Sequence, residues 1–84
     1  MYKLIESYIV NYSGDNILIY DVIENIEEEF NISASMIFKN INKSISQIFE
    51  IYKSTFDHVP DDSKDIIENF KNLLVEKYFY YDEE

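Results

Sequence analysis

The sequence predicts an all-α protein, a small antiparallel four-helix bundle in one helical domain that spans residues 1–84. Apolar side chains recur at steps of three and four residues along most of the chain, which is the spacing of amphipathic helices. The breaks between these stripes hold turn-forming residues such as Gly14 and Pro60. Four helices joined by short loops pack most simply as an antiparallel bundle. A core of this size leaves no room for a deep substrate cavity.

The first two predicted helices cover residues 2–12 and 16–30. Gly14, the only glycine, is expected to adopt the left-handed conformation that ends the first helix. The run over residues 17–20 also has the β-branched and aromatic composition of a strand. We favour a helix there, because the run lacks alternation and leads into glutamates. The apolar stripes of the two helices are Leu4, Ile5, Tyr8, Ile9 and Tyr12, followed by Ile19, Val22, Ile23, Ile26 and Phe30.

The third and fourth predicted helices cover residues 34–56 and 62–80. Ser33 or Ser35 is expected to cap the third helix. Pro60 disfavours helical geometry in the residue before it, which places the connecting loop there. Asp61, Asp62 or Ser63 is expected to cap the fourth helix, and the apolar stripes are Ile37, Phe38, Ile41, Ile45, Ile48, Phe49, Tyr52 and Phe56, then Ile66, Ile67, Phe70, Leu73, Leu74 and Tyr78.

The charge balance limits the possible partners. Seven basic residues face 17 acidic ones, which gives a net charge of −10. Such a surface argues against direct binding to nucleic acid or to an anionic membrane, and it favours a basic protein partner. Because the chain has no cysteine, no apolar run of membrane-spanning length and no cationic leader, we expect a cytoplasmic protein. The frequent isoleucine, asparagine, tyrosine and lysine are typical of AT-rich bacterial or phage genes.

Catalytic and metal-binding motifs are not found. The single histidine, His58, falls in a predicted loop and is expected to be partly exposed. A zinc site needs several cysteines or histidines, and phosphate-binding and calcium-binding loops need glycines that the chain lacks. The sequence therefore predicts no enzyme, no catalytic residue, no metal and no cofactor.

The predicted second helix carries the main candidates for binding a partner. Asp21, Glu24 and Glu28 would form one solvent-facing stripe, with Glu27 beside it. Like charges at this spacing destabilise a helix by about 0.2–0.5 kcal/mol per pair, and carboxylates near the C-terminal end oppose the helix dipole. We therefore expect a cationic partner to cover these residues. The alternative is an acidic face that only keeps the protein soluble.

Tyr80 and Tyr81 are the candidate apolar anchors of the same partner surface. They follow the fourth apolar stripe, and tyrosine is enriched at the energetic centres of interfaces. The alternative is that these rings pack back over the N-terminal segment, against Tyr2, Tyr8 and Tyr12.

Size, acidity, predicted helix content and tyrosines beside carboxylates make the chain resemble the small bacterial immunity proteins of nuclease colicins and of contact-dependent growth inhibition systems. The resemblance extends over the whole chain and implies a protein that binds and neutralises a basic nuclease toxin. The paired tyrosines of the colicin-type motif precede a proline, whereas Tyr80 and Tyr81 lie near the C-terminus and precede three acidic residues, so no binding residue is transferred by position. Such a role predicts a monomer before binding and leaves a dimer open.

Two other functions remain open from the sequence. A phage-encoded inhibitor or nucleic-acid mimic, of the anti-CRISPR or anti-restriction type, would have the same acidic surface. A helical structural or regulatory domain that self-associates through its aromatic surface would belong to a different class.

Overall fold

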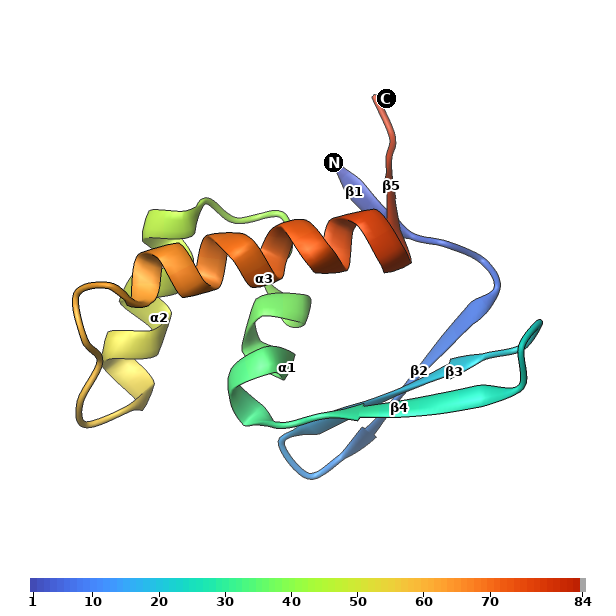
Figure 1. Cartoon of the computed structure of the whole chain (residues 1–84), viewed down its shortest axis with the longest axis horizontal. Coiled ribbons are helices and arrows are strands. Elements are labelled where there is room, and N and C mark those ends of the chain that lie inside the picture. The colour runs from blue at the N-terminus through green and yellow to red at the C-terminus, as the bar shows by residue number, and fades with distance from the viewer. Residues whose placement is uncertain (84) are drawn as a thin grey trace.

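The computed structural model describes residues 1–83 and shows an α+β fold, so the predicted all-α helical bundle is wrong (Figure 1). Within these residues, five strands form two antiparallel sheets of order β2-β3-β4 and β1-β5, accompanied by three helices. The elements in chain order are β1 (Tyr2–Leu4), β2 (Tyr8–Ser13), β3 (Asn16–Asp21), β4 (Ile26–Phe30), α1 (Ile32–Lys39), α2 (Ile45–Thr55), α3 (Ser63–Tyr78) and β5 (Phe79–Tyr81).

Strands replace the first two predicted helices, over residues 2–12 and 16–30. The register of β3 places Ile17 opposite Phe30 of β4 and Ile19 opposite Glu28. Ile17 and Ile19 are fully buried on the inner face of the sheet, whereas the residues between and after them are half-buried on the outer face. Because those outer residues, Leu18 and Tyr20, are also apolar, the alternation of a strand is hidden in the sequence.

Two tight turns make this sheet a meander. Gly14 has φ +62°, so its predicted left-handed conformation is confirmed, but it turns the chain from β2 to β3 and ends no helix. At the next turn, the Asp21 carboxylate accepts hydrogen bonds from the backbone N–H groups of Ile23 (3.0 Å) and Glu24 (3.1 Å). Asn25 follows with φ 58°, a conformation that asparagine tolerates better than most residues.

The third predicted helix, over residues 34–56, is divided into α1 and α2. Asn31 caps α1 by accepting a hydrogen bond from the Ala34 backbone N–H, so neither Ser33 nor Ser35 is the cap. Ser44 begins α2 with a capping box that it shares with Gln47. The chain turns between α1 and α2, and the capping box supplies hydrogen-bond partners for backbone N–H groups at the start of α2.

The fourth predicted helix, over residues 62–80, agrees best with the structure. α3 covers Ser63–Tyr78, and Asp62 occupies the N-cap position without a side-chain hydrogen bond to the helix. The helix ends earlier than predicted because Phe79–Tyr81 forms β5, which pairs antiparallel with β1. The first and last parts of the described chain therefore lie side by side (Figure 1).

The core lies between the inner face of the β2-β3-β4 sheet and the helices. β3 contributes Ile17 and Ile19, and the helices contribute buried isoleucine, leucine and aromatic side chains. Ser35 of α1 is a fully buried polar residue, and its hydroxyl donates to the Phe30 carbonyl (3.0 Å) and accepts from the Ile17 N–H (3.0 Å). This serine therefore attaches α1 to both β3 and β4. Among residues 1–83, no helix combines the length and apolarity needed to cross a bilayer.

Candidate functional site

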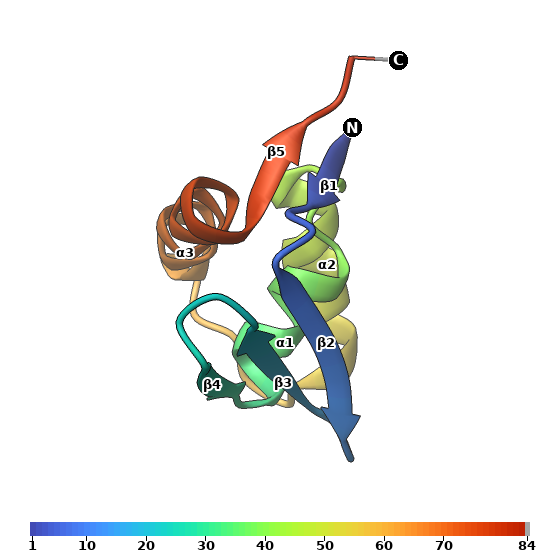
Figure 2. The ribbon, with the colours of Figure 1, turned by 90° about the vertical axis from the view of Figure 1, so that its right-hand side faces the viewer.

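A groove follows the outer edge of β4 and one exposed face of α3. β4 is the last strand in the order β2-β3-β4, so its outer edge pairs with no other strand among residues 1–83. It is also the edge on the same side of the molecule as α3, while β2 lies on the opposite side (Figure 2). The edge strand of an antiparallel sheet leaves alternate backbone N–H and C=O groups available for another strand.

The facing side of α3 is largely apolar, and the core covers only part of it. Ile66, Phe70, Leu73 and Lys77 follow one another at helical steps of four, three and four residues, and so share one face. Ile66 is 64% exposed and Leu73 is 61% exposed. The core takes a neighbouring stripe, Ile67, Leu74 and Tyr78. α3 therefore presents a second apolar stripe toward the groove.

Three hollows lie along this groove. One of about 210 Å³ lies at the β3–β4 turn, with Ile19 and Tyr8 among its apolar walls. Another of about 150 Å³ lies directly between β4 and α3 and is lined by Phe30, Phe70 and Leu73. The third, of about 270 Å³, continues past Phe70 to Ile66, where α3 meets α1 and α2. The groove thus offers apolar contacts along much of α3.

A polar bridge crosses the groove between the first two hollows. The Lys77 ammonium lies 2.9 Å from one carboxylate oxygen of Glu28, and the Tyr78 hydroxyl donates a hydrogen bond to the other. The bonds from Tyr78 and Lys77 hold the pKa of Glu28 below its usual value. The bond to Glu28 raises the pKa of Lys77, and burial, followed by the bond to Glu28, raises the pKa of Tyr78 to about 12. At neutral pH the bridge is therefore a closed ion pair.

The floor of the groove is built from aromatic rings. The Phe30 ring packs against Phe70 (centroids 6.1 Å apart) and against Tyr78 (5.9 Å) in edge-to-face geometry. Tyr78 in turn contacts Tyr8 at 4.8 Å. These contacts join the inner face of β4 to α3, so the two walls of the groove are held at a fixed separation.

The structure brings together three of the four predicted acidic site residues, although by a different route. Asp21, Glu24 and Glu28 line the hollow at the β3–β4 turn, because a hairpin and not a helix places them there. Glu27 points to the opposite face of the sheet, with Tyr20 as its partner across the strands. The argument from crowded charges on a helix is therefore wrong. Glu28 in particular is neutralised by Lys77 from α3.

The predicted tyrosine anchors lie elsewhere. Tyr80 and Tyr81 belong to β5, in the second sheet, and both are exposed. The Tyr81 ring packs edge-to-face on Tyr2, with centroids 5.3 Å apart. This contact agrees with the alternative prediction, in which these rings pack over the N-terminal segment. The lining of the three hollows includes neither tyrosine.

The groove residues of α3 were missed because the sequence assigns them to the core. The predicted stripe includes two adjacent pairs, Ile66 with Ile67 and Leu73 with Leu74. Adjacent residues of a helix point about 100° apart, so a stripe containing both members of two pairs is wider than one contact face. That excess width is the signal that could have revealed the groove. Among residues 1–83, no three His, Cys, Asp or Glu side chains converge as a metal-binding group.

The fold is similar to that of a solved structure. No family model and no curated protein matches the chain. The structure of TbiB1 in complex with the TbiA(beta) leader peptide matches with a TM-score of 0.70 over 95% of this chain and 99% of that chain. The two sequences are 13% identical, so the match shows a shared fold.

Proposed function

We propose that this chain binds an extended peptide segment, which adds a strand to the free edge of β4 and places alternate side chains in the groove beside α3. The single observation that carries the proposal is the position of the β4 edge, which no strand of the described residues pairs, next to hollows lined by Phe70 and Leu73. An added strand takes its affinity from main-chain hydrogen bonds and its specificity from pockets for alternate side chains. The groove supplies both.

The exposed stripe on α3 supports this mode of binding. Ile66 and Leu73 remain in water in the free protein although each has a large apolar side chain. Removing such surface from water is worth about 25 cal/mol per Å² of apolar area. Side chains of an added strand that point toward the inner face of the sheet would cover this stripe. TbiB1, whose structure has a similar fold, is in complex with a leader peptide, which also supports a peptide as the occupant.

The first experiment identifies a ligand and its location. A random dodecapeptide library is selected by mRNA display against the purified chain, and the enriched peptides are synthesised. Hydrogen exchange should slow at alternate backbone amides of Ile26–Phe30 when such a peptide binds. N-methylation along the peptide should weaken binding with a period of two residues, because only alternate N–H groups face β4.

A matched pair of variants tests the groove itself. Leu73→Asp should weaken the selected peptides about tenfold or more, since it places a charge among apolar contacts at the centre of the groove. Ile23→Asp adds the same charge at a side chain that is 76% exposed in the β3–β4 turn, and should change affinity by less than about twofold. Failure to enrich any binder, or peptides that bind both variants equally, would contradict the proposed function.

Neutralisation of a basic nuclease toxin is a second proposal, and the net charge of −10 is the observation that favours it. A toxin would add a strand or a basic loop to the same acidic side of the molecule. Co-purification from the native operon, followed by a nuclease assay of the captured partner with and without this chain, tests the proposal. A captured partner without nuclease activity would exclude it.

A further inference from the structure

We infer that the segment bound at β4 is basic, with two lysine or arginine side chains separated by one residue and placed opposite Glu27 and Glu29. The residues of the bound segment that face the groove are apolar. This inference rests on the proposed function and gives its ligand a chemical class and a spacing.

The register of the sheet determines which side chains an added strand would meet. Ile26, Glu28 and Phe30 share the inner face with Ile17 and Ile19, because they pair with alternate residues of β3. Glu27 and Glu29 alternate with them and therefore lie on the outer face, where both are exposed. A strand added to β4 must have the same parity, so every second side chain lies beside these two glutamates.

The two faces of β4 differ in how their charge is compensated. On the inner face, the Glu28 carboxylate is already paired with Lys77 at 2.9 Å. On the outer face, Glu29 accepts a hydrogen bond from the neutral side chain of Asn16 at 2.8 Å. Among residues 1–83, the ion pairs include no lysine for Glu27 or Glu29. The uncompensated charge therefore lies on the outer face alone.

Charge complementarity then selects the occupant. Opposite charges directly across two strands stabilise their pairing, and like charges oppose it. An acidic or neutral segment would leave two adjacent carboxylates without a counter-charge, in a chain whose net charge is −10. In a single register, a segment with basic residues at positions i and i+2 places one positive charge opposite each of the two glutamates. The position between them faces Glu28, which Lys77 has neutralised, and so needs no charge.

The dodecapeptide selection is the direct test. Enriched sequences should contain lysine or arginine at two positions separated by one residue, with apolar residues at the intervening and flanking positions. A second selection against Glu27→Lys/Glu29→Lys should enrich aspartate or glutamate at the same spacing. Enriched peptides without this periodic charge would overturn the inference.

Affinity measurements separate local pairing from general attraction. Glu27→Gln/Glu29→Gln should weaken a selected basic peptide about 2- to 30-fold at 150 mM salt, the range expected for two cross-strand ion pairs. Glu6→Gln/Glu68→Gln removes the same charge at exposed sites away from the groove and should cost less than about twofold. If both double variants lose the same peptide affinity, the effect comes from net charge and not from pairing at β4, and the inference is overturned.

The outcomes for the two proposals are distinct. If the peptides lose affinity for Leu73→Asp but show no basic periodicity, the groove remains the binding site and the inference of a basic ligand is overturned. Peptides that carry the basic period but bind Leu73→Asp normally would place the contact outside the groove and overturn both proposals. Basic periodicity together with sensitivity to Leu73→Asp and to Glu27→Gln/Glu29→Gln supports both.

Discussion

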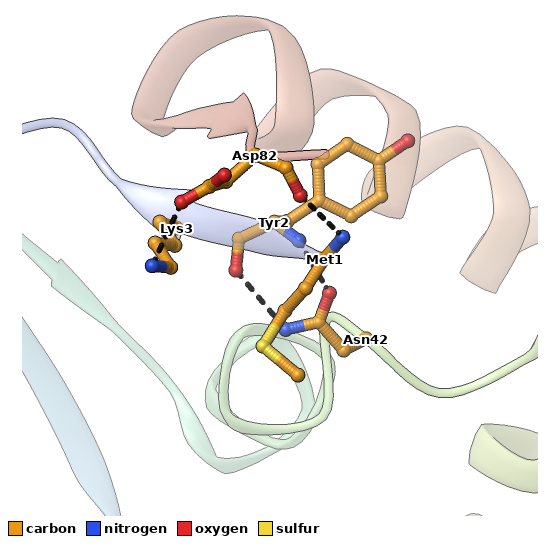
Figure 3. A network of polar contacts seen from close by, with 5 residues as sticks. All are labelled: Met1, Tyr2, Lys3, Asn42 and Asp82. Carbon is orange, nitrogen blue, oxygen red and sulfur yellow. Dashed lines mark hydrogen bonds and ion pairs between the residues drawn. The ribbon is translucent and has the colours of Figure 1, made fainter. Parts of the chain in front are cut away.

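The outer edges of β1 and β4 are protected in different ways. At β1, the side-chain amide of Asn42 takes the place of a neighbouring strand: it accepts from the Tyr2 N–H (2.6 Å) and donates to the Tyr2 carbonyl (3.1 Å) (Figure 3). Across the pairing with β5, Lys3 forms an ion pair with Asp82 at 2.8 Å. At β4, residues 1–83 offer no strand on the outer side, and the flanking side chains are glutamates.

The difference indicates which of these two edges has a role outside the folded chain. Backbone N–H and C=O groups need hydrogen-bond partners, and on the outer side of β1 Tyr2 obtains both from Asn42. β4 obtains them from water or from a second chain. Charged side chains on an edge oppose pairing with a copy of the same edge, because like charges would meet. The glutamates of β4 therefore guard against self-pairing while admitting a strand of opposite charge.

Replacing the two exposed glutamates of the β4 edge should have the largest effect. Glu27→Val/Glu29→Val leaves the open edge apolar on its outer face, with the β-branched residues that favour strand pairing. We expect the variant to self-associate, with a weight-average mass in sedimentation that rises with concentration well beyond that of the parent. Glu6→Val/Glu68→Val makes the same change at exposed sites away from β4 and serves as the control. Equal association of both variants would contradict the guarding role.

The next largest effect is expected at the buried attachment of this edge. Ser35→Ala removes the hydroxyl that bonds the Ile17 N–H and the Phe30 carbonyl, and leaves both groups without that partner. The expected loss is about 2 kcal/mol in the free energy of unfolding, measured by urea denaturation. Ser33→Ala, at a half-buried position two residues earlier, should change it by less than about 0.5 kcal/mol. A small effect at Ser35 would mean that water replaces its hydrogen bonds.

The sequence predicted the helical half of the chain better than the strands. α3 agrees with its prediction because its apolar spacing and its helix formers point the same way. The β2-β3-β4 sheet was missed for two physical reasons. Apolar residues on both faces of β3 hide its alternation, and Ile26–Phe30 is three glutamates between two apolar ends, a composition typical of helices. Edge position explains those glutamates, and edge position is a tertiary property.

The candidate site was predicted in part. The acidic character of the segment around Glu24 and Glu28 is visible in the composition, and the hairpin does gather these residues at one hollow. The sequence also holds the turn residues Asp21 and Asn25, but the predicted helix over residues 16–30 includes both. The exposed stripe with Leu73 could not be separated from the core stripe by spacing, because the position of β4 decides which residues the core covers.

A moderate effect is expected at the protected edge of β1. Asn42→Ala removes both hydrogen bonds to Tyr2 and should cost about 1 kcal/mol, since each exposed bond contributes less than a buried one. Hydrogen exchange at the Tyr2 backbone amide should also be faster in Asn42→Ala than in the parent. Asn11→Ala, at an exposed position of β2, is the matched control and should be nearly neutral. An unchanged Tyr2 amide would contradict the view that Asn42 replaces a strand.

The smallest effect is expected at the bridge across the groove. Lys77 and Glu28 have side chains 54% and 42% exposed, so solvent screens their pair, and Glu28→Gln should cost about 0.5–1 kcal/mol at pH 7. The pKa of Glu28 is lowered in the fold by Tyr78 and Lys77, so its stabilisation is present above its ordinary pKa of 4.5 and is lost as the pH falls through the folded value. Glu28→Gln should therefore flatten the acid limb of stability against pH.

The alkaline limb should respond differently to the same substitution. Tyr78 has a pKa raised to about 12, chiefly by burial, so it favours the fold below its ordinary pKa of 10.0 and loses that contribution as the pH rises toward 12. Lys77, whose pKa the Glu28 bond raises, likewise stabilises the fold below its ordinary pKa of 10.5 and loses that contribution at higher pH. Glu28→Gln removes the bonded carboxylate but not the burial of Tyr78, so much of the alkaline slope should persist. Urea denaturation at a series of pH values, with Glu24→Gln as the control for charge, measures both limbs. An acid limb that Glu28→Gln leaves unchanged would show that the bridge does not hold β4 to α3 in solution.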